Sequence, residues 1–111
     1  MQTQMPVRTA PEVAALRATA TDIVERGSTD YRMAVARAVL ATLDWIDGTA
    51  GNPASGDPLV ADDVGIVREQ MRAEDLERAL MRAFADGTWP GTVGQTLAWY
   101  RCGAFTESPL L

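Results

Sequence analysis

The chain has 111 residues, and its ten basic residues are all arginine, so it contains neither lysine nor histidine. The absence of histidine excludes Ser-His-Asp and Cys-His nucleophiles, HExxH zinc sites and imidazole bases, and the absence of lysine excludes P-loop and Schiff-base chemistry. A single cysteine, Cys102, excludes an internal disulfide and a CxxC motif. The net charge of -5 disfavours contact with nucleic-acid phosphates, because the arginines do not cluster in the sequence.

The sequence predicts one domain over residues 1–111, because a chain of this length can bury an apolar core without a metal ion or a disulfide. Residues 1–9 are polar and lack an apolar run, so we expect a flexible N-terminus and no signal peptide. No run of eighteen apolar residues occurs, which predicts no membrane span. We therefore expect a cytoplasmic protein that needs neither a membrane nor a cofactor.

Two helices are predicted in the first half of the chain. Thr9 and Glu12 form a capping-box pattern that opens a helix over residues 11–26, and Gly27 supplies its stop. A new N-cap follows at once, and apolar residues then recur at helical spacing over residues 29–47. Because so few residues join the two helices, we expect them to fold back on each other as an αα-hairpin.

Residues 48–58 are rich in turn formers and make the longest predicted loop, which divides the chain into halves. Residues 59–86 have a helical pattern whose apolar phase changes partway along. The first stripe holds Val60, Val64, Val67 and Met71, and the second holds Leu76, Ala79, Leu80, Ala83 and Phe84. A straight helix cannot bury both stripes against one surface, so we predict a break near residues 72–73, with Asp62 or Asp63 as the first cap.

Residues 88–91, Thr-Trp-Pro-Gly, predict a rigid turn before a last helix over residues 92–102, and we expect the tail 104–111 to pack on the core. The whole pattern predicts an all-α fold, a single-domain bundle of four to five helices. The residues predicted to form its core are Leu16, Ile23, Val35, Val39, Ile46, Val67, Leu80, Phe84, Leu97 and Trp99.

A possible internal repeat links the two halves. The pattern Val-x-x-Thr-Leu-x-Trp occurs at residues 39–45 and again at residues 93–99, an offset of 54, and Gly48 and Gly103 follow the two copies. If the repeat is real, each half is a helical hairpin, and stacking the two halves gives a pseudo-symmetric bundle. The pattern also fits two unrelated amphipathic helices that end in the same way, and the sequence leaves both interpretations open.

One short segment resembles a known group of proteins. Residues 43–48 read Leu-Asp-Trp-Ile-Asp-Gly, and residues 53–56 read Pro-Ala-Ser-Gly. This segment resembles a helix-end cassette found in small uncharacterised proteins of actinomycete bacteria and their phages. The resemblance implies an actinobacterial or phage-related origin and no particular activity.

With so few catalytic residues, we expect a non-catalytic protein-interaction or regulatory module that presents a helical face to a protein partner or to a second copy. The candidate interface residues are Met33, Leu40, Trp45, Trp89 and Trp99. Met33 and Leu40 project from the second face of their predicted helix, where the other half of the chain or a partner could cover them. Tryptophan is enriched both in protein cores and in interfaces, so both roles stay open for the three tryptophans.

Two other functions stay open. Glu74 and Glu77, beside Glu69, resemble one of the Glu-x-x-Glu pairs with which all-α nucleotide pyrophosphohydrolases hold Mg²⁺, although the second pair is missing. The same glutamates alternate with Arg78 and Arg82, which is also typical of a solvated helix face. The other alternative is an acidic mimic of DNA that inhibits a nucleic-acid enzyme, and the interspersed arginines argue against it.

Overall fold

A computed structural model describes residues 7–54, 60–102 and 108–110, and these residues form a compact all-α unit. Its helices are α1 (Ala10–Arg26), α2 (Asp30–Ile46), α3 (Asp63–Arg82) and α4 (Thr88–Cys102). The predicted all-α bundle is therefore confirmed, with four helices in the described ranges. The second part of the predicted loop 48–58 and most of the predicted tail, including Phe105, lie outside the described residues.

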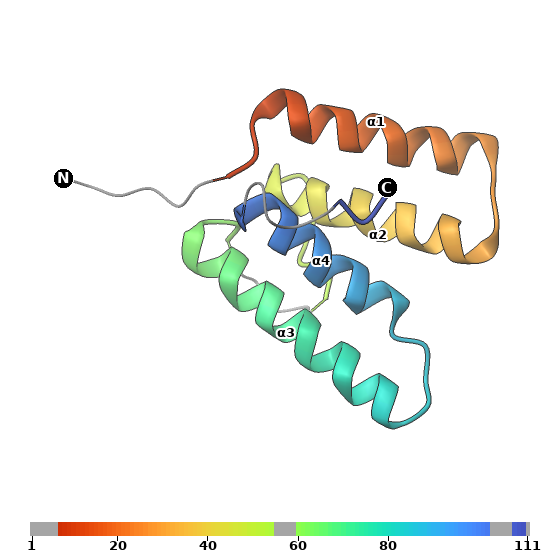
Figure 1. Cartoon of the computed structure of the whole chain (residues 1–111). Coiled ribbons are helices and arrows are strands. Elements are labelled where there is room, and N and C mark those ends of the chain that lie inside the picture. Colours follow the sequence, from red (N-terminus) through yellow and green to blue (C-terminus); the bar gives the residue numbers. More distant parts are fainter. Residues whose placement is uncertain (1–6, 55–59, 103–107, 111) are drawn as a thin grey trace.

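The four helices are arranged as two hairpins that meet through their second helices. α1 packs on α2, α3 packs on α4, and α2 and α4 pack on each other. Figure 1 shows the result: α2 and α4 lie in the middle of the molecule, while α1 and α3 lie on opposite sides of them. The two outer helices therefore each have one face covered by their hairpin partner.

The predicted starts of α1, α2 and α3 are confirmed by the caps in the structure. The Thr9 side chain accepts a hydrogen bond from the Glu12 amide, and the Glu12 carboxylate accepts one from the Thr9 amide, which completes the capping box of α1. Thr29 caps α2 and Asp62 caps α3 through their side-chain oxygens. The hydrogen bonds to Glu12 from Thr9 and Arg8 lower the pKa of its carboxyl below its ordinary value of 4.5.

The buried residues form two clusters, and each contains a tryptophan from the other hairpin. Trp99 of α4 lies in a cluster with residues of α1 and α2, and Leu110 also packs there. Trp45 of α2 lies in the other cluster, with residues of α3 and α4 such as Ile66 and Leu97. Because each hairpin packs around the tryptophan of the other, the two hairpins form one packed unit.

The eight residues of the two Val-x-x-Thr-Leu-x-Trp patterns are all buried, with at most 6% exposure. They are Val39, Thr42, Leu43 and Trp45 on α2, and Val93, Thr96, Leu97 and Trp99 on α4. Both threonine hydroxyls donate to the backbone carbonyl four residues earlier, Thr42 to Ala38 at 2.8 Å and Thr96 to Thr92 at 2.7 Å. The two patterns therefore occupy matching environments in the folded chain.

The predicted break at residues 72–73 is wrong, because α3 continues through it without interruption. α3 lies at the edge of the bundle and packs mainly on α4, so only one of its faces needs to be apolar. Its buried residues are Gly65, Ile66, Glu69 and Ala73. The first predicted stripe lies outside: Val60, Val64 and Met71 are 74%, 61% and 59% exposed.

The assignment of Phe84 to the core is also wrong, because its side chain is 99% exposed. α3 ends at Arg82, and Phe84 adopts a left-handed backbone conformation with φ of 57°. The chain leaves the helical path there, so Phe84 no longer follows the stripe that runs through Leu80. Ile46, Val67 and Leu80 are only partly buried, whereas the other predicted core residues are buried.

We predict that Phe84→Gly stabilises the fold by about 0.5–1 kcal/mol, because glycine adopts a left-handed conformation without a steric penalty. The Phe84 side chain is fully exposed, so its removal costs no core packing. Urea unfolding followed by circular dichroism measures the change. A loss of stability in Phe84→Gly would show that the side chain has an intramolecular contact, and Phe84→Ala is the matched control that keeps a Cβ atom.

The start of α4 is the third correction, since residues 88–91 form its first turn rather than a turn before it. Pro90 is compatible with this position because the first turn needs no amide donor from it. The Asp86 carboxylate accepts hydrogen bonds from the amide and the hydroxyl of Thr88, at 2.9 and 2.6 Å. These bonds lower the pKa of Asp86 below its ordinary value of 3.8 and fasten the start of the helix.

Candidate functional site

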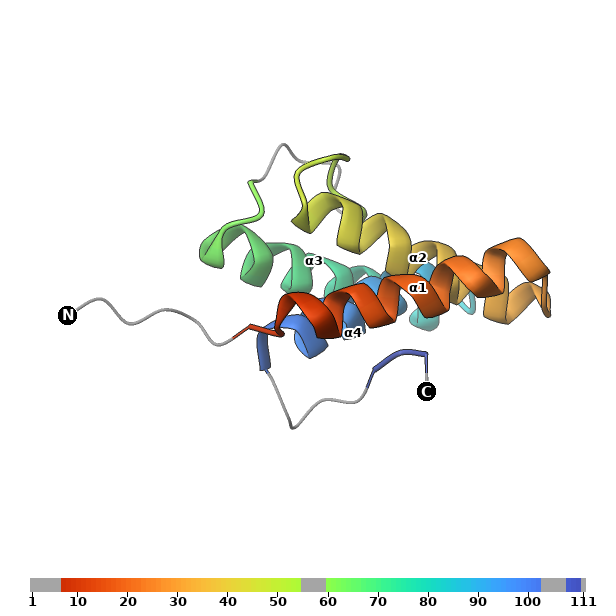
Figure 2. The ribbon, with the colours of Figure 1, turned by 90° about the horizontal axis from the view of Figure 1, so that it is seen from above.

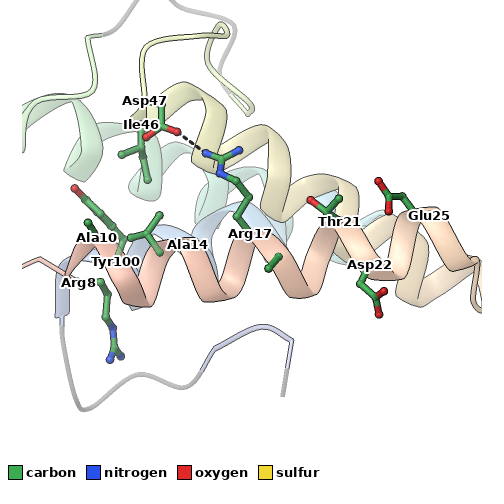
Figure 3. Close-up of a pocket in the computed structure, with 12 residues that line it drawn as sticks. Arg8, Ala10, Ala14, Arg17, Thr21, Asp22, Glu25, Ile46, Asp47 and Tyr100 are labelled. Atoms are coloured by element: carbon green, nitrogen blue, oxygen red, sulfur yellow. Dashed lines mark hydrogen bonds and ion pairs between the residues drawn. The ribbon is translucent and has the colours of Figure 1, made fainter.

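An open groove of about 770 Å³ lies along α1, the helix that lies over α2 and α4 in the view of Figure 2. Figure 3 shows its floor on α1, where Ala10 and Ala14 are among the residues drawn, with Ile46 and Asp47 from the end of α2 and Tyr100 from α4 beside it. Ala14 and Ala18 are exposed small residues. The groove is therefore broad and shallow, with charged side chains at its edges.

Arg17 crosses the groove and joins α1 to the end of α2. Its guanidinium donates to Asp44 and to Asp47, both at 2.5 Å. The three side chains are 32%, 42% and 52% exposed. Such solvent-exposed pairs typically contribute about 0.2–1 kcal/mol each. Arg17 thus links α1 to the end of α2.

Arg8 fastens the residues before α1 to the end of α4. Its backbone amide donates to the Tyr100 carbonyl at 2.9 Å, its side chain donates to the Trp99 carbonyl at 2.9 Å, and its guanidinium lies 4.8 Å from the centre of the Trp99 ring. The end of the N-terminal segment, which we expected to be flexible, is held here.

Partial burial and the nearby carboxylates of Asp47 and Asp63 raise the pKa of Tyr100 above its ordinary value of 10.0.

The two glutamates of the predicted magnesium pair lie between α3 and α4. A Cβ atom built on Gly91 would lie 2.2 Å from Glu77 Oε2, and one on Gly94 would lie 3.3 Å from Glu74 Cγ. The glutamates therefore fill the space that the two glycines leave on α4, and the Glu77 carboxylate lies near the positive end of that helix. In the part of the chain that the structure describes, no group of three acidic or cysteine side chains is close enough to share a metal ion.

The five candidate interface residues differ in burial. Trp45 and Trp99 are 3% and 6% exposed and belong to the core, so neither can contact a partner in the folded chain. Met33 and Leu40 are half-buried against the first cluster. The structure thus places the two tryptophans in the core, and Met33 and Leu40 at its edge.

Trp89 has a different role, because it holds the central loop. Its indole N–H donates to the Pro53 carbonyl at 2.7 Å, and 40% of the residue stays exposed. The Glu69 carboxylate holds the same loop, since its Oε2 accepts a hydrogen bond from the Ala54 amide at 2.8 Å. Glu69 is fully buried, so it is a structural residue between α3 and the loop.

The outward face of α3 exposes apolar side chains of the first predicted stripe, which were expected to be buried. We define this face as Val64, Val67 and Met71, whereas Val60 precedes the N-cap Asp62 and lines a small pocket with Trp45 and Ile46. Val67 is half-buried between its exposed neighbours. Two charged residues flank the face: Asp63 and Arg68 are both exposed. The apolar spacing of these residues was visible in the sequence, but the sequence did not show whether they would face the bundle or the solvent.

Comparisons with protein-family models, with curated proteins and with solved structures found no match to this chain. Among the described residues, none of the helices combines the length and the apolar content that a membrane crossing requires.

Proposed function

We propose that this protein is a non-catalytic interaction module that binds a protein through the outward face of α3. The observation that carries the proposal is the exposure of Val64 and Met71, which are 61% and 59% exposed on the same face of α3 as the half-buried Val67. Single exposed apolar residues are common, whereas several on one face of a helix mark a contact surface.

The energetics of this face support binding. Full burial of a valine or methionine side chain contributes about 1.5–3 kcal/mol relative to exposure. Two such side chains offset part of the entropy that association loses, so a partner helix could bind with useful affinity. In the groove on α1 the exposed apolar residues are alanines, and the larger Val13, Ile46 and Tyr100 are partly buried.

We further propose that the two hairpins are internal repeats whose outer helices have diverged. The matching burial of the two Val-x-x-Thr-Leu-x-Trp patterns and the exchange of Trp45 and Trp99 between hairpins support this proposal. In such a pair, α1 and α3 would be equivalent outer helices. At the offset of 54, Val64 and Met71 of α3 correspond to Ala10 and Arg17 of α1, so the apolar face of α3 would be a specialised feature of the second repeat.

The experiment compares two double variants of equal charge. Val64→Glu with Met71→Glu alters the outward face of α3, and Ala14→Glu with Ala18→Glu alters the exposed face of α1. Proteins captured by the tagged wild-type chain in its source cells are identified, purified and titrated by calorimetry. We expect the α3 variant to lose at least tenfold in affinity, which corresponds to about 1.4 kcal/mol, and the α1 variant to bind as the wild type does.

Circular dichroism must show that both variants remain folded with similar unfolding midpoints. If the α1 variant loses binding and the α3 variant keeps it, the groove is the contact surface and the proposal is wrong. If a turnover of a small molecule depends on Glu74 and Glu77, the non-catalytic assignment is wrong.

A further inference from the structure

We propose that the outward face of α3 binds the same face of a second copy of this chain, with the two helices parallel. This inference rests on the proposed function and names its partner. It follows from the spacing of the apolar residues on α3, from the charges beside them and from the position of α3 at the edge of the bundle.

The spacing is that of a short coiled-coil seam. Val64, Val67 and Met71 are separated by three and four residues, the alternation that keeps apolar side chains along the contact line of two helices. The residues of α3 that face α4, such as Ile66 and Ala73, are buried on the other side of the helix. Figure 1 shows α3 at the lower edge of the molecule, with α4 on one side only. A second α3 can therefore approach without displacing α4.

The charged residues beside the seam can form ion pairs with the same residues of a second copy. Asp63 directly precedes the seam residue Val64, and Arg68 directly follows Val67. In a parallel pair of helices, the residue just before one seam position lies beside the residue five positions later on the other helix. Asp63 of each copy therefore lies beside Arg68 of the other copy. A two-fold interface requires a patch that complements itself in this way, and the contact occurs twice.

The length of the seam sets the strength of the association. After Met71 the next seam positions are Glu74 and Arg78, so the apolar contact is confined to the first half of α3. An interface this short buries less area than a standard stable interface. We therefore expect a weak dimer whose population rises with concentration.

The test is sedimentation equilibrium of the full chain from low micromolar to millimolar concentration. The wild type should change from the mass of one chain to that of two, and Val64→Glu with Met71→Glu should remain a single chain throughout. The Ala14→Glu with Ala18→Glu variant, which has the same added charge on α1, should dimerise as the wild type does.

A charge exchange tests the parallel arrangement. Asp63→Arg alone and Arg68→Asp alone should each weaken the dimer several-fold, because each places like charges across the seam. The double variant Asp63→Arg with Arg68→Asp should restore it, an outcome that a merely structural effect on α3 would not produce. Failure of the double variant to recover would overturn the parallel pairing, since an antiparallel pair would not place these two residues together.

The outcomes separate this inference from the proposed function. A wild-type chain that stays a single copy at every concentration overturns the self-pairing. If the α3 variant still loses an identified partner protein in that case, the proposed function stands and the partner is another protein. If the α3 variant changes neither self-association nor partner binding, both proposals fail.

Discussion

Replacing Leu97 by alanine is expected to lower the free energy of unfolding by about 2–5 kcal/mol, because the substitution leaves a cavity in a packed core. Leu97 is fully buried in the cluster that also contains Trp45. Leu43, its counterpart in the first hairpin, is fully buried in the other cluster, so Leu43→Ala should have an effect of the same size. Urea unfolding monitored by circular dichroism measures both values.

The matched control is Leu76→Ala, since Leu76 is on α3 and is 39% exposed. This substitution should cost clearly less than either core substitution. Both core variants should also unfold in a single transition, because the exchanged tryptophans make the two clusters one cooperative unit. Separate transitions for the two hairpins would contradict this description of the core.

Replacing Glu69 by alanine is expected to lower the free energy of unfolding by about 1–3 kcal/mol, because the Ala54 amide would lose its acceptor in a partly buried setting. The Glu69 side chain is also fully buried, so its removal leaves an unfilled space against α3. Glu69→Gln keeps a carbonyl oxygen that can accept from the Ala54 amide, and it should therefore lose less stability than the alanine variant.

Hydrogen exchange at the Ala54 amide is the measurement specific to the loop. Exchange should be faster in Glu69→Ala than in Glu69→Gln, while amides in the middle of α2 change only in proportion to global stability. Asp75→Ala, an exposed position on the same helix, serves as the control. If Glu69→Ala exchanges as slowly at Ala54 as the wild type, then Trp89 alone holds the loop and the role given to Glu69 is wrong.

The helices could be predicted from the sequence because their signals are local. The capping box at Thr9 and Glu12, the caps at Thr29 and Asp62, and the apolar spacing of Leu16, Ala20 and Ile23 are set by residues within a few turns. Most of the predicted core residues on α1, α2 and α4 follow from the same spacing and are buried. Local chemistry therefore determined most of the fold.

The errors have a common physical cause, which is that periodicity shows which residues share a face but not which face is covered. The sequence of residues 59–86 has two apolar stripes, and the predicted break would have let both be buried. The structure keeps α3 whole, exposes Val64 and Met71, and buries Glu69, which the sequence showed only as a neighbour of Glu74 and Glu77. Only the position of α3 at the edge of the bundle decides between these outcomes.

Two features of the site depend on contacts that no sequence pattern records. A Cβ atom on Gly65 would lie 1.7 Å from the Val60 carbonyl oxygen, so glycine is required there by a close approach of the chain to α3. The sequence showed Gly65 only as a weak point in a predicted helix. The exchange of Trp45 and Trp99 between the hairpins likewise depends on how α2 meets α4.

The central claim is that the outward face of α3 is the surface through which this chain binds. Methyl NMR spectra of the valine and methionine side chains, recorded as the concentration of the chain or of an identified partner rises, test it most directly. We expect the signals of Val64, Val67 and Met71 to shift while those of the buried Val35 and Val39 stay in place. Shifts confined to the groove, at Val13, with no change on α3 would contradict the claim.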